Sequence, residues 1–151
     1  MRLLLSAVLT LLAIAVGCTS PSNTQPGDLR AFTTDGCSGF PEGPPGHPNL
    51  WCECCVAHDF AYWKGGTSAQ RKVADAKLRA CVTERYKALT GTLMELGVRA
   101  GGTPYLPTSY RWGYGWPFGR GYAPVTPEEE PVVEERGRNY EQARMDRCGS
   151  G

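Results

Sequence analysis

The sequence has almost no net charge. Lys and Arg together number 16 and Asp and Glu 15, so the chain lacks the basic excess that marks nucleic-acid-binding domains. We therefore expect no nucleic-acid partner, and no protein partner is evident. The chain also has only two histidines, His47 and His58, which leaves few nitrogen ligands for zinc. We therefore expect most of its cysteines to form disulfides, with a zinc site as the alternative.

Long apolar runs are also scarce. Leu3–Val16 is almost entirely apolar, but it is shorter than the roughly 20 residues that a membrane-spanning helix needs. With Arg2 ahead of it, this run is typical of an export signal over Met1–Gly17. The next feature, "AVGC" at Ala15–Cys18, resembles the lipobox of bacterial lipoproteins, in which the cysteine is acylated and becomes the new N-terminus. Ordinary signal cleavage after "AIA", Ala13–Ala15, is the alternative.

The lipobox resemblance implies an exported bacterial lipoprotein anchored in the cell envelope at Cys18. Thr19, in place of an acidic residue, favours the outer membrane. Exported chains meet an oxidising compartment in which disulfides persist. Without Cys18, six cysteines remain, an even number that permits 15 pairings. They are Cys37, Cys52, Cys54, Cys55, Cys81 and Cys148.

We divide the chain into four parts. Residues 1–17 are the expected signal peptide and 18–30 a lipidated tether. Residues 31–124 form the one domain that this length allows. Residues 125–151 form an acidic tail that ends in a cysteine clasp. In this tail we expect the glutamates Glu128–Glu130 and Glu134–Glu135 to be solvated, and we expect a short helix over Asn139–Arg147.

The domain begins with a loop and two helices. Asp35–Pro48 is too rich in Gly and Pro for regular structure, and His47 within it is expected to be a loop residue without chemistry. A helix is predicted over Asn49–Trp63, ended by the glycines at 65 and 66. A second helix is predicted from Thr67, where Gln70 completes a capping box, continuing past Gly91 toward Ala100.

The segment Tyr110–Tyr122 is aromatic and glycine-rich, and three interpretations stay open. It forms an irregular lid packed over the helix pair, or a surface for the membrane–water boundary that Trp and Tyr favour. In the second case Arg111 and Arg120 would meet lipid phosphates. The third interpretation is a site for peptidoglycan or another glycan.

The stretch "CCVAHDFAYW", Cys54–Trp63, concentrates the reactive side chains. In two antiparallel helices joined by a tight turn, facing residues have position numbers with a nearly constant sum. The register that would permit a Cys54–Cys81 disulfide therefore also brings Asp75 opposite His58. Cys54, His58 and Tyr62 recur every four residues and share one helix face, so the Tyr62 hydroxyl can reach Asp75 as well.

These spacings resemble the active-site signature of the secreted phospholipase A2 family. "CCVAHDFAY" has its two cysteines, two variable residues, His-Asp, and a Tyr three positions after the Asp. The family's second-helix aspartate lies six residues before a cysteine, as Asp75 lies before Cys81. The resemblance covers about a third of the chain, 35–81. Asp35-Gly36-Cys37 matches the order in shorter bacterial members, whereas Ala61 and Ala74 replace a disulfide of the animal members.

The resemblance implies a fold and a disulfide pattern. The fold is mostly all-α: an antiparallel helix pair of phospholipase A2 type, stapled by disulfides and joined to Gly/Pro-rich loops. The family pattern implies the disulfides Cys54–Cys81 and Cys37–Cys55, which leave Cys52 and Cys148 as the third pair.

The resemblance also implies a catalytic apparatus for hydrolysis of the sn-2 ester of glycerophospholipids at a membrane surface. His58 would be the general base that activates water, since histidine titrates near neutral pH. Asp75 would orient His58, and Tyr62 would support Asp75. For Tyr62 the alternative is simple packing.

Calcium is the implied cofactor, and it would stabilise the oxyanion. Asp59 would supply a carboxylate and Gly36 and Ser38 backbone carbonyls, which suit a hard cation. Further candidates are the Asp35 carboxylate and the Phe40 carbonyl. Asp59 as a solvated helix charge is the alternative at that position. For the whole chain, the alternative is a catalytically silent lipoprotein of the same fold with a binding or structural role in the envelope.

Overall fold

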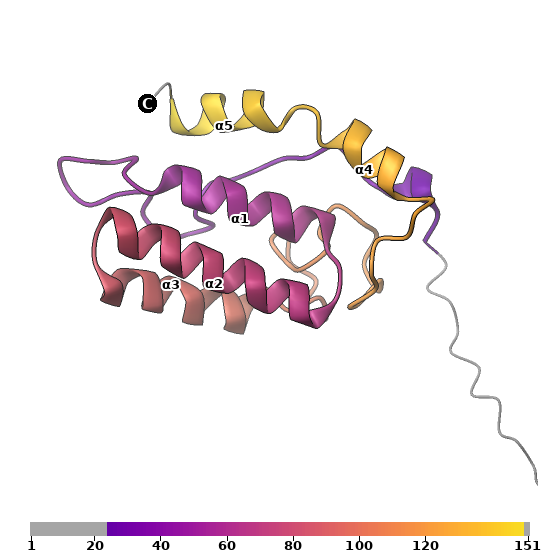
Figure 1. Cartoon of the computed structure of the whole chain (residues 1–151), viewed down its shortest axis with the longest axis horizontal. Coiled ribbons are helices and arrows are strands. Elements are labelled where there is room, and N and C mark those ends of the chain that lie inside the picture. The colour runs from indigo at the N-terminus through magenta and orange to yellow at the C-terminus, as the bar shows by residue number, and fades with distance from the viewer. Residues whose placement is uncertain (1–23, 150–151) are drawn as a thin grey trace, which may run out of the picture.

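The computed structural model describes residues 24–149, and every regular element within this range is a helix (Figure 1). The expected all-α fold is therefore confirmed at this level. The expected signal peptide and residues 18–23 of the expected tether, including Cys18, lie outside the described residues. The elements are the 3-10 turn η1, Pro26–Asp28, and the helices α1, Cys52–Lys64; α2, Ser68–Arg85; α3, Ala88–Gly101; α4, Glu130–Arg136; and α5, Tyr140–Cys148.

Helices α1 and α2 form the predicted pair and lie side by side (Figure 1). The turn between them uses Gly65 and Gly66, whose φ angles of 72° and 131° lie where glycine is favoured. The predicted capping box begins α2, because the Thr67 hydroxyl accepts from the Gln70 N–H and the Gln70 side chain accepts from the Thr67 N–H. Helix α1 begins at Cys52, three residues later than predicted.

The prediction that the second helix continues toward Ala100 is wrong. Helix α2 ends at Arg85, because Tyr86 adopts φ −147° and ψ −102°, outside the helical region. The chain turns back and α3 packs against α2 (Figure 1). Gly91 sits at this contact, where a Cβ atom would lie 2.6 Å from both the Arg79 carbonyl oxygen and the Thr83 hydroxyl oxygen. The absence of a side chain at Gly91 therefore permits the close approach of the two helices.

The aromatic segment packs against the helix pair. Trp112 and Trp116 are buried beside Trp63, and their indole N–H groups donate to the carbonyls of Gly66 and Lys64 at 2.7 and 2.8 Å. These bonds tie the segment to the turn between α1 and α2. The packing supports the lid interpretation for this part of the segment.

The arginines of this segment are not available for lipid phosphates, a contact that the membrane-surface interpretation of the segment would use. Arg111 is buried and donates to the carbonyls of Gly113 and Trp116 at 2.9 and 2.7 Å. Arg120 is buried and forms a bidentate pair with Glu129, both contacts at 2.7 Å. Both guanidinium groups are occupied by the fold itself.

The C-terminal part is folded, which corrects one part of the expected solvated tail: Glu128, Glu130, Glu134 and Glu135 are exposed as expected, but Glu129 is not. Glu129 is buried in its pair with Arg120, and Val133 of α4 lies in the core. Helix α5 confirms the predicted terminal helix and lies along α1 (Figure 1). Because Arg120 is buried, its charge requires a partner, and Glu129 supplies it.

All three expected disulfides are present. Cys37 is bonded to Cys55, Cys54 to Cys81, and Cys52 to Cys148. The first ties the glycine-rich loop to α1, the second joins α1 to α2, and the third joins α1 to the end of α5. No helix among residues 24–149 is long and apolar enough to cross a membrane.

Candidate active site

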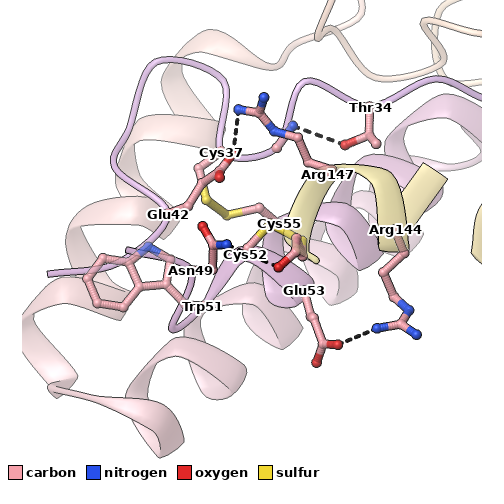
Figure 2. Close-up of a disulfide and its surroundings, with 12 residues drawn as sticks. Thr34, Cys37, Glu42, Asn49, Trp51, Cys52, Glu53, Cys55, Arg144 and Arg147 are labelled. Atoms are coloured by element: carbon pink, nitrogen blue, oxygen red, sulfur yellow. Dashed lines mark hydrogen bonds and ion pairs between the residues drawn. A yellow bond between two sulfur atoms is a disulfide. The ribbon is translucent and has the colours of Figure 1, made fainter. Parts of the chain in front are cut away.

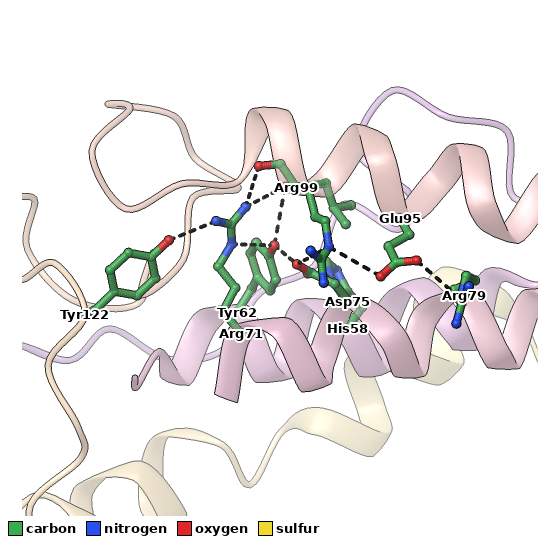
Figure 3. A network of polar contacts seen from close by, with 9 residues as sticks. His58, Tyr62, Arg71, Asp75, Arg79, Glu95, Arg99 and Tyr122 are labelled. Carbon is green, nitrogen blue, oxygen red and sulfur yellow. Dashed lines mark hydrogen bonds and ion pairs between the residues drawn. The ribbon is translucent and has the colours of Figure 1, made fainter. Parts of the chain in front are cut away.

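His58 and Asp75 face each other across α1 and α2, as the helix register predicts (Figure 3). His58 Nε2 lies 3.1 Å from Asp75 Oδ1, and both side chains are buried, Asp75 with 1% of its surface exposed. A carboxylate only accepts hydrogen bonds, so Nε2 carries the proton in this contact. In the neutral ring, Nδ1 then keeps a free lone pair. The pair therefore has the tautomer that a general base needs.

Tyr62 makes the predicted contact with Asp75. Its hydroxyl donates to Asp75 Oδ1 at 2.7 Å, and its ring centroid lies 4.1 Å from that of His58. Burial raises the pKa of the Tyr62 hydroxyl well above its ordinary value, and the hydrogen bond and charge of Asp75 raise it further, although Arg71 opposes this. The hydroxyl therefore stays protonated at neutral pH. Tyr62 is a hydrogen-bond donor here as well as a packing residue.

A cavity of about 270 Å³ opens beside this pair. His58, Asp59, Tyr62 and Tyr110 are among its polar lining residues, and residues 36–40 of the glycine-rich loop, including Ser38, form one side. Helix α3 forms another side with Leu93, Met94, Gly97, Val98 and Gly101. An apolar wall with a few converging polar groups is typical of a small-molecule site, and this volume is near the lower end for such sites.

Asp59 is buried, which excludes its interpretation as a solvated helix charge. Its Oδ2 accepts a hydrogen bond of 2.6 Å from the Thr34 hydroxyl. Burial raises the pKa of the Asp59 carboxyl to about 8; the Thr34 hydrogen bond opposes this rise and the nearby charge of Asp35 adds to it. Within residues 24–149, Asp59 forms no ion pair with a basic side chain. The site thus contains a buried carboxyl group without a neighbouring cation in contact.

The loop beside Asp59 turns sharply through left-handed residues. Gly36, Ser38 and Gly39 have φ angles of 77°, 45° and 85°, and Ser38 is the only non-glycine residue with positive φ in the described range. The Ser38 hydroxyl donates to Asp35 Oδ1 at 2.7 Å. Within residues 24–149, the carbonyls of Gly36 and Ser38 accept no hydrogen bond. Those two carbonyl oxygens stay available for another partner.

These groups fit a hard cation in the chemistry of their donors. All are oxygens, which calcium prefers, and the Asp59 carboxyl has no countercharge in contact. Among the described residues, no three Asp, Glu, His or Cys side chains converge as metal ligands. A bound calcium ion would therefore take most of its ligands from backbone carbonyls and water, with Asp59 and at most Asp35 as carboxylates.

The C-terminal helix also contacts this loop (Figure 2). Arg147 Nη2 lies 2.5 Å from Glu42 Oε1, and this ion pair covers Gly36. The Trp51 indole N–H donates to the Pro41 carbonyl at 2.6 Å on the same loop. Together with the Cys37–Cys55 disulfide, these contacts hold the loop against α1.

The sequence analysis predicted no role in the site for three of its residues. Thr34 lies in an irregular segment, where no sequence pattern indicates its contact with Asp59. Arg71 precedes Asp75 by four residues on α2, a spacing that places both on one face. Arg99 lies with its Nε 3.8 Å from Asp75 Oδ2, and it belongs to the helix whose reversal was not predicted (Figure 3).

His47 is exposed in the loop and lies apart from the residues that line the cavity, in agreement with its expected position. Comparison of the chain with protein-family models, curated proteins and solved structures found no match. The geometry around His58 is therefore the basis for a functional proposal.

Proposed function

We propose that this protein hydrolyses the sn-2 ester of glycerophospholipids in a calcium-dependent reaction of the phospholipase A2 type. The observation that carries the proposal is the buried His58–Asp75 pair beside a cavity that is also lined by Asp59, whose carboxyl has no ion-pair partner among the described residues. A general base, an orienting carboxylate and an oxygen-rich site for a cation are the groups that ester hydrolysis by activated water needs.

In this mechanism, His58 Nδ1 removes a proton from a water molecule, and the water oxygen bonds to the ester carbonyl carbon. Asp75 holds the imidazole through Nε2 and stabilises the imidazolium that forms. When the tetrahedral intermediate collapses, the bond to the glycerol oxygen breaks. His58 then returns its proton to that oxygen, so that a fatty acid and a lysophospholipid leave.

Asp59, the carbonyls of Gly36 and Ser38, and the Asp35 carboxylate are the groups that would hold calcium. When bound, calcium would supply the positive charge that the developing oxyanion requires. Thr34 orients Asp59 by donating to its Oδ2. Because the loop of residues 36–40 is held against α1, its oxygens lose less conformational entropy when they bind an ion.

The surroundings of the cavity support a phospholipid surface as the partner. Three residues of its lining, Phe40, Leu93 and Tyr110, are exposed. Helix α3 adds Leu89 and Leu96, which are 70% and 58% exposed. We call these five residues the apolar rim. With the lipobox at Cys18, the rim fits an exported lipoprotein of the cell envelope that acts on lipids in a bilayer.

The burial of Asp59 favours the alternative, a silent scaffold of this type with a binding or structural role. A pKa of about 8 leaves the Asp59 carboxyl largely neutral near pH 7, and a neutral carboxyl is a poor calcium ligand. Calcium must therefore displace a proton from Asp59 to bind, which lowers its apparent affinity at neutral pH.

Fatty-acid release from mixed phosphatidylglycerol and phosphatidylcholine micelles tests the proposal. The protein of residues 19–151, which includes every described element, is assayed with calcium and with a chelator. His58→Gln should reduce release at least about 100-fold, whereas His47→Gln, at the other histidine, should leave it unchanged. The weakest protein calcium sites have a Kd of about 10⁻³ M. Absence of release by protein with three intact disulfides, at every calcium concentration up to about ten times that value, would favour the silent scaffold.

A further inference from the structure

Arg71 of α2 is a buried guanidinium that the proposed mechanism does not use. Its Nε donates to the Tyr62 hydroxyl at 3.0 Å and its Nη1 to the Tyr122 hydroxyl at 2.9 Å (Figure 3). Its Nη2 donates to the carbonyls of Val98 and Arg99 at 2.9 and 2.8 Å, at the C-terminal end of α3. All three guanidinium nitrogens are thus engaged, and none of their partners is a carboxylate.

The Tyr62 hydroxyl has one proton and two acceptors within reach. Asp75 Oδ1 lies at 2.7 Å and the Val98 carbonyl oxygen at 3.4 Å. Arginine can only donate, so the Tyr62 oxygen must accept from Arg71 Nε, and its own proton must point elsewhere. Arg71 Nη2 also donates to the Val98 carbonyl oxygen, so this oxygen competes less well for the Tyr62 proton. Both contacts of Arg71 therefore direct the Tyr62 proton to Asp75.

We propose that Arg71 is a positioning residue that orients the Tyr62 hydroxyl and, through it, holds Asp75 Oδ1 against His58. The catalytic consequence rests on the proposed hydrolase function, whereas the direction of the hydroxyl does not. The planar fork of Arg71 suits this role because it binds Tyr62 and the end of α3 at the same time. Arg71 thereby links the aromatic segment, α3 and the His58–Asp75 pair.

Kinetics of variants test the catalytic consequence. In Arg71→Met, kcat should fall about 10- to 100-fold, as for other residues that orient a catalytic group, with KM nearly unchanged. Tyr62→Phe should cause a similar loss, and the double variant should be no slower than Tyr62→Phe alone, because Arg71 acts through that hydroxyl. Additive losses in the double variant would overturn the proposal.

A matched control separates positioning from general stability. Arg120 is also a buried arginine that joins loop segments, but its partners are Glu129, Thr24 and Pro124. Arg120→Met should lower the unfolding temperature and leave kcat unchanged below it. If Arg71→Met does not fold, Arg71→Lys replaces it. Lysine keeps the positive charge, but its single side-chain nitrogen cannot make the contacts that Arg71 makes through three nitrogens. Wild-type kcat in Arg71→Lys would overturn the proposal.

Proton NMR of the same proteins tests the hydroxyl itself. In wild type the Tyr62 hydroxyl proton, assigned by its loss in Tyr62→Phe, should exchange slowly and resonate downfield. Arg71→Met should shift or broaden this signal, and Arg120→Met should not. An unchanged signal in Arg71→Met would overturn the proposal. If wild type releases no fatty acid but the signal responds to Arg71→Met, the hydrolase function fails while the assigned direction of the hydroxyl is supported.

Discussion

Arg147 and Glu42 form an ion pair directly over Gly36, so that the last helix of the chain covers the loop beside Asp59. A Cβ atom on Gly36 would lie 1.9 Å from Glu42 Oε1 and 2.6 Å from Arg147 Nε. Gly36 is therefore needed for two reasons, its φ of 77° and the space that the ion pair takes.

Gly36→Ala should destabilise the protein and weaken calcium binding. The left-handed backbone alone costs about 1–2 kcal/mol for alanine, and displacement of the ion pair adds to this. Gly39→Ala is the matched control, because Gly39 has a φ of 85° but open space around its Cβ position. Urea denaturation and calcium titration measure both variants. Equal effects of the two substitutions would contradict the role of the ion pair.

The buried pair of Arg120 and Glu129 should make stability depend on acid pH. Although burial raises the pKa of Glu129, hydrogen bonds from Arg120 and the Thr126 N–H outweigh it, and the pKa lies below its ordinary value. A carboxyl with a lowered folded-state pKa contributes stability above its unfolded pKa and loses it as pH falls through the folded value. Glu129→Gln leaves Arg120 buried without a charge partner and should cost about 3 kcal/mol at pH 7.

Urea denaturation of wild type and Glu129→Gln between pH 2 and pH 7 measures this dependence. The difference between the two proteins should be largest at neutral pH and should shrink below about pH 4.5, the ordinary range of a glutamate. Glu134→Gln, on the exposed side of α4, is the control and should stay within about 0.5 kcal/mol of wild type. A constant difference across the whole pH range would show that Glu129 does not act through its charge.

The core of the candidate site could be predicted from sequence because it depends on two adjacent helices. A tight glycine turn and helical periodicity fix which residues of α1 and α2 face each other, so the contacts of His58 and Tyr62 with Asp75 follow from local rules. The disulfide pairing came from the family resemblance, and the three observed bonds agree with it.

The contributions of distant segments could not be predicted in this way. Gly91 within a helical pattern is compatible with one continuous helix, and only the approach of α3 to Arg79 and Thr83 explains it. Glu129 looks like one member of a solvated acidic run until its partner Arg120 is found in the core. Such residues are positioned by tertiary packing, for which local propensity is a weak guide.

The apolar rim should matter for action on bilayers and not for the chemical step. The double variant Leu89→Asp and Leu96→Asp places two charges on exposed positions of α3, where the free energy of unfolding should change little. Fatty-acid release from anionic vesicles should fall at least about tenfold, and so should co-sedimentation of the protein with them. Full burial of one leucine side chain in the membrane contributes about 1.5–3 kcal/mol to binding.

Hydrolysis of a soluble short-chain ester by this double variant should match wild type, because neither leucine lines the cavity. Val73→Asp is the control on α2, at an exposed position outside the rim. It should leave both activities unchanged. Equal losses on vesicles and on the soluble ester would show that α3 had been disturbed and that the rim has no specific part in membrane binding.

Asp59 should make the calcium-free protein less stable as pH rises. Its pKa of about 8 exceeds the ordinary value of 3.8 because of burial, although the Thr34 hydrogen bond opposes the rise. A carboxyl with a raised folded-state pKa contributes stability that is present below its unfolded pKa and is lost as pH rises through the folded value. In chelator, wild type should therefore lose stability relative to Asp59→Asn between about pH 4 and pH 8, since asparagine does not titrate.

Calcium should reverse this loss only in proteins that keep the Asp59 carboxyl. An ion bound by the Asp59 carboxylate offsets the cost of its buried charge, and at 100 times its Kd it should add about 2.7 kcal/mol to stability. Thermal denaturation at pH 8 with calcium and with chelator compares wild type, Asp59→Asn and Asp28→Asn, the last at an exposed aspartate of η1. The unfolding temperature should rise with calcium in wild type and in Asp28→Asn. A similar rise in Asp59→Asn would place any calcium site elsewhere, and a rise in none of the three would favour the silent scaffold.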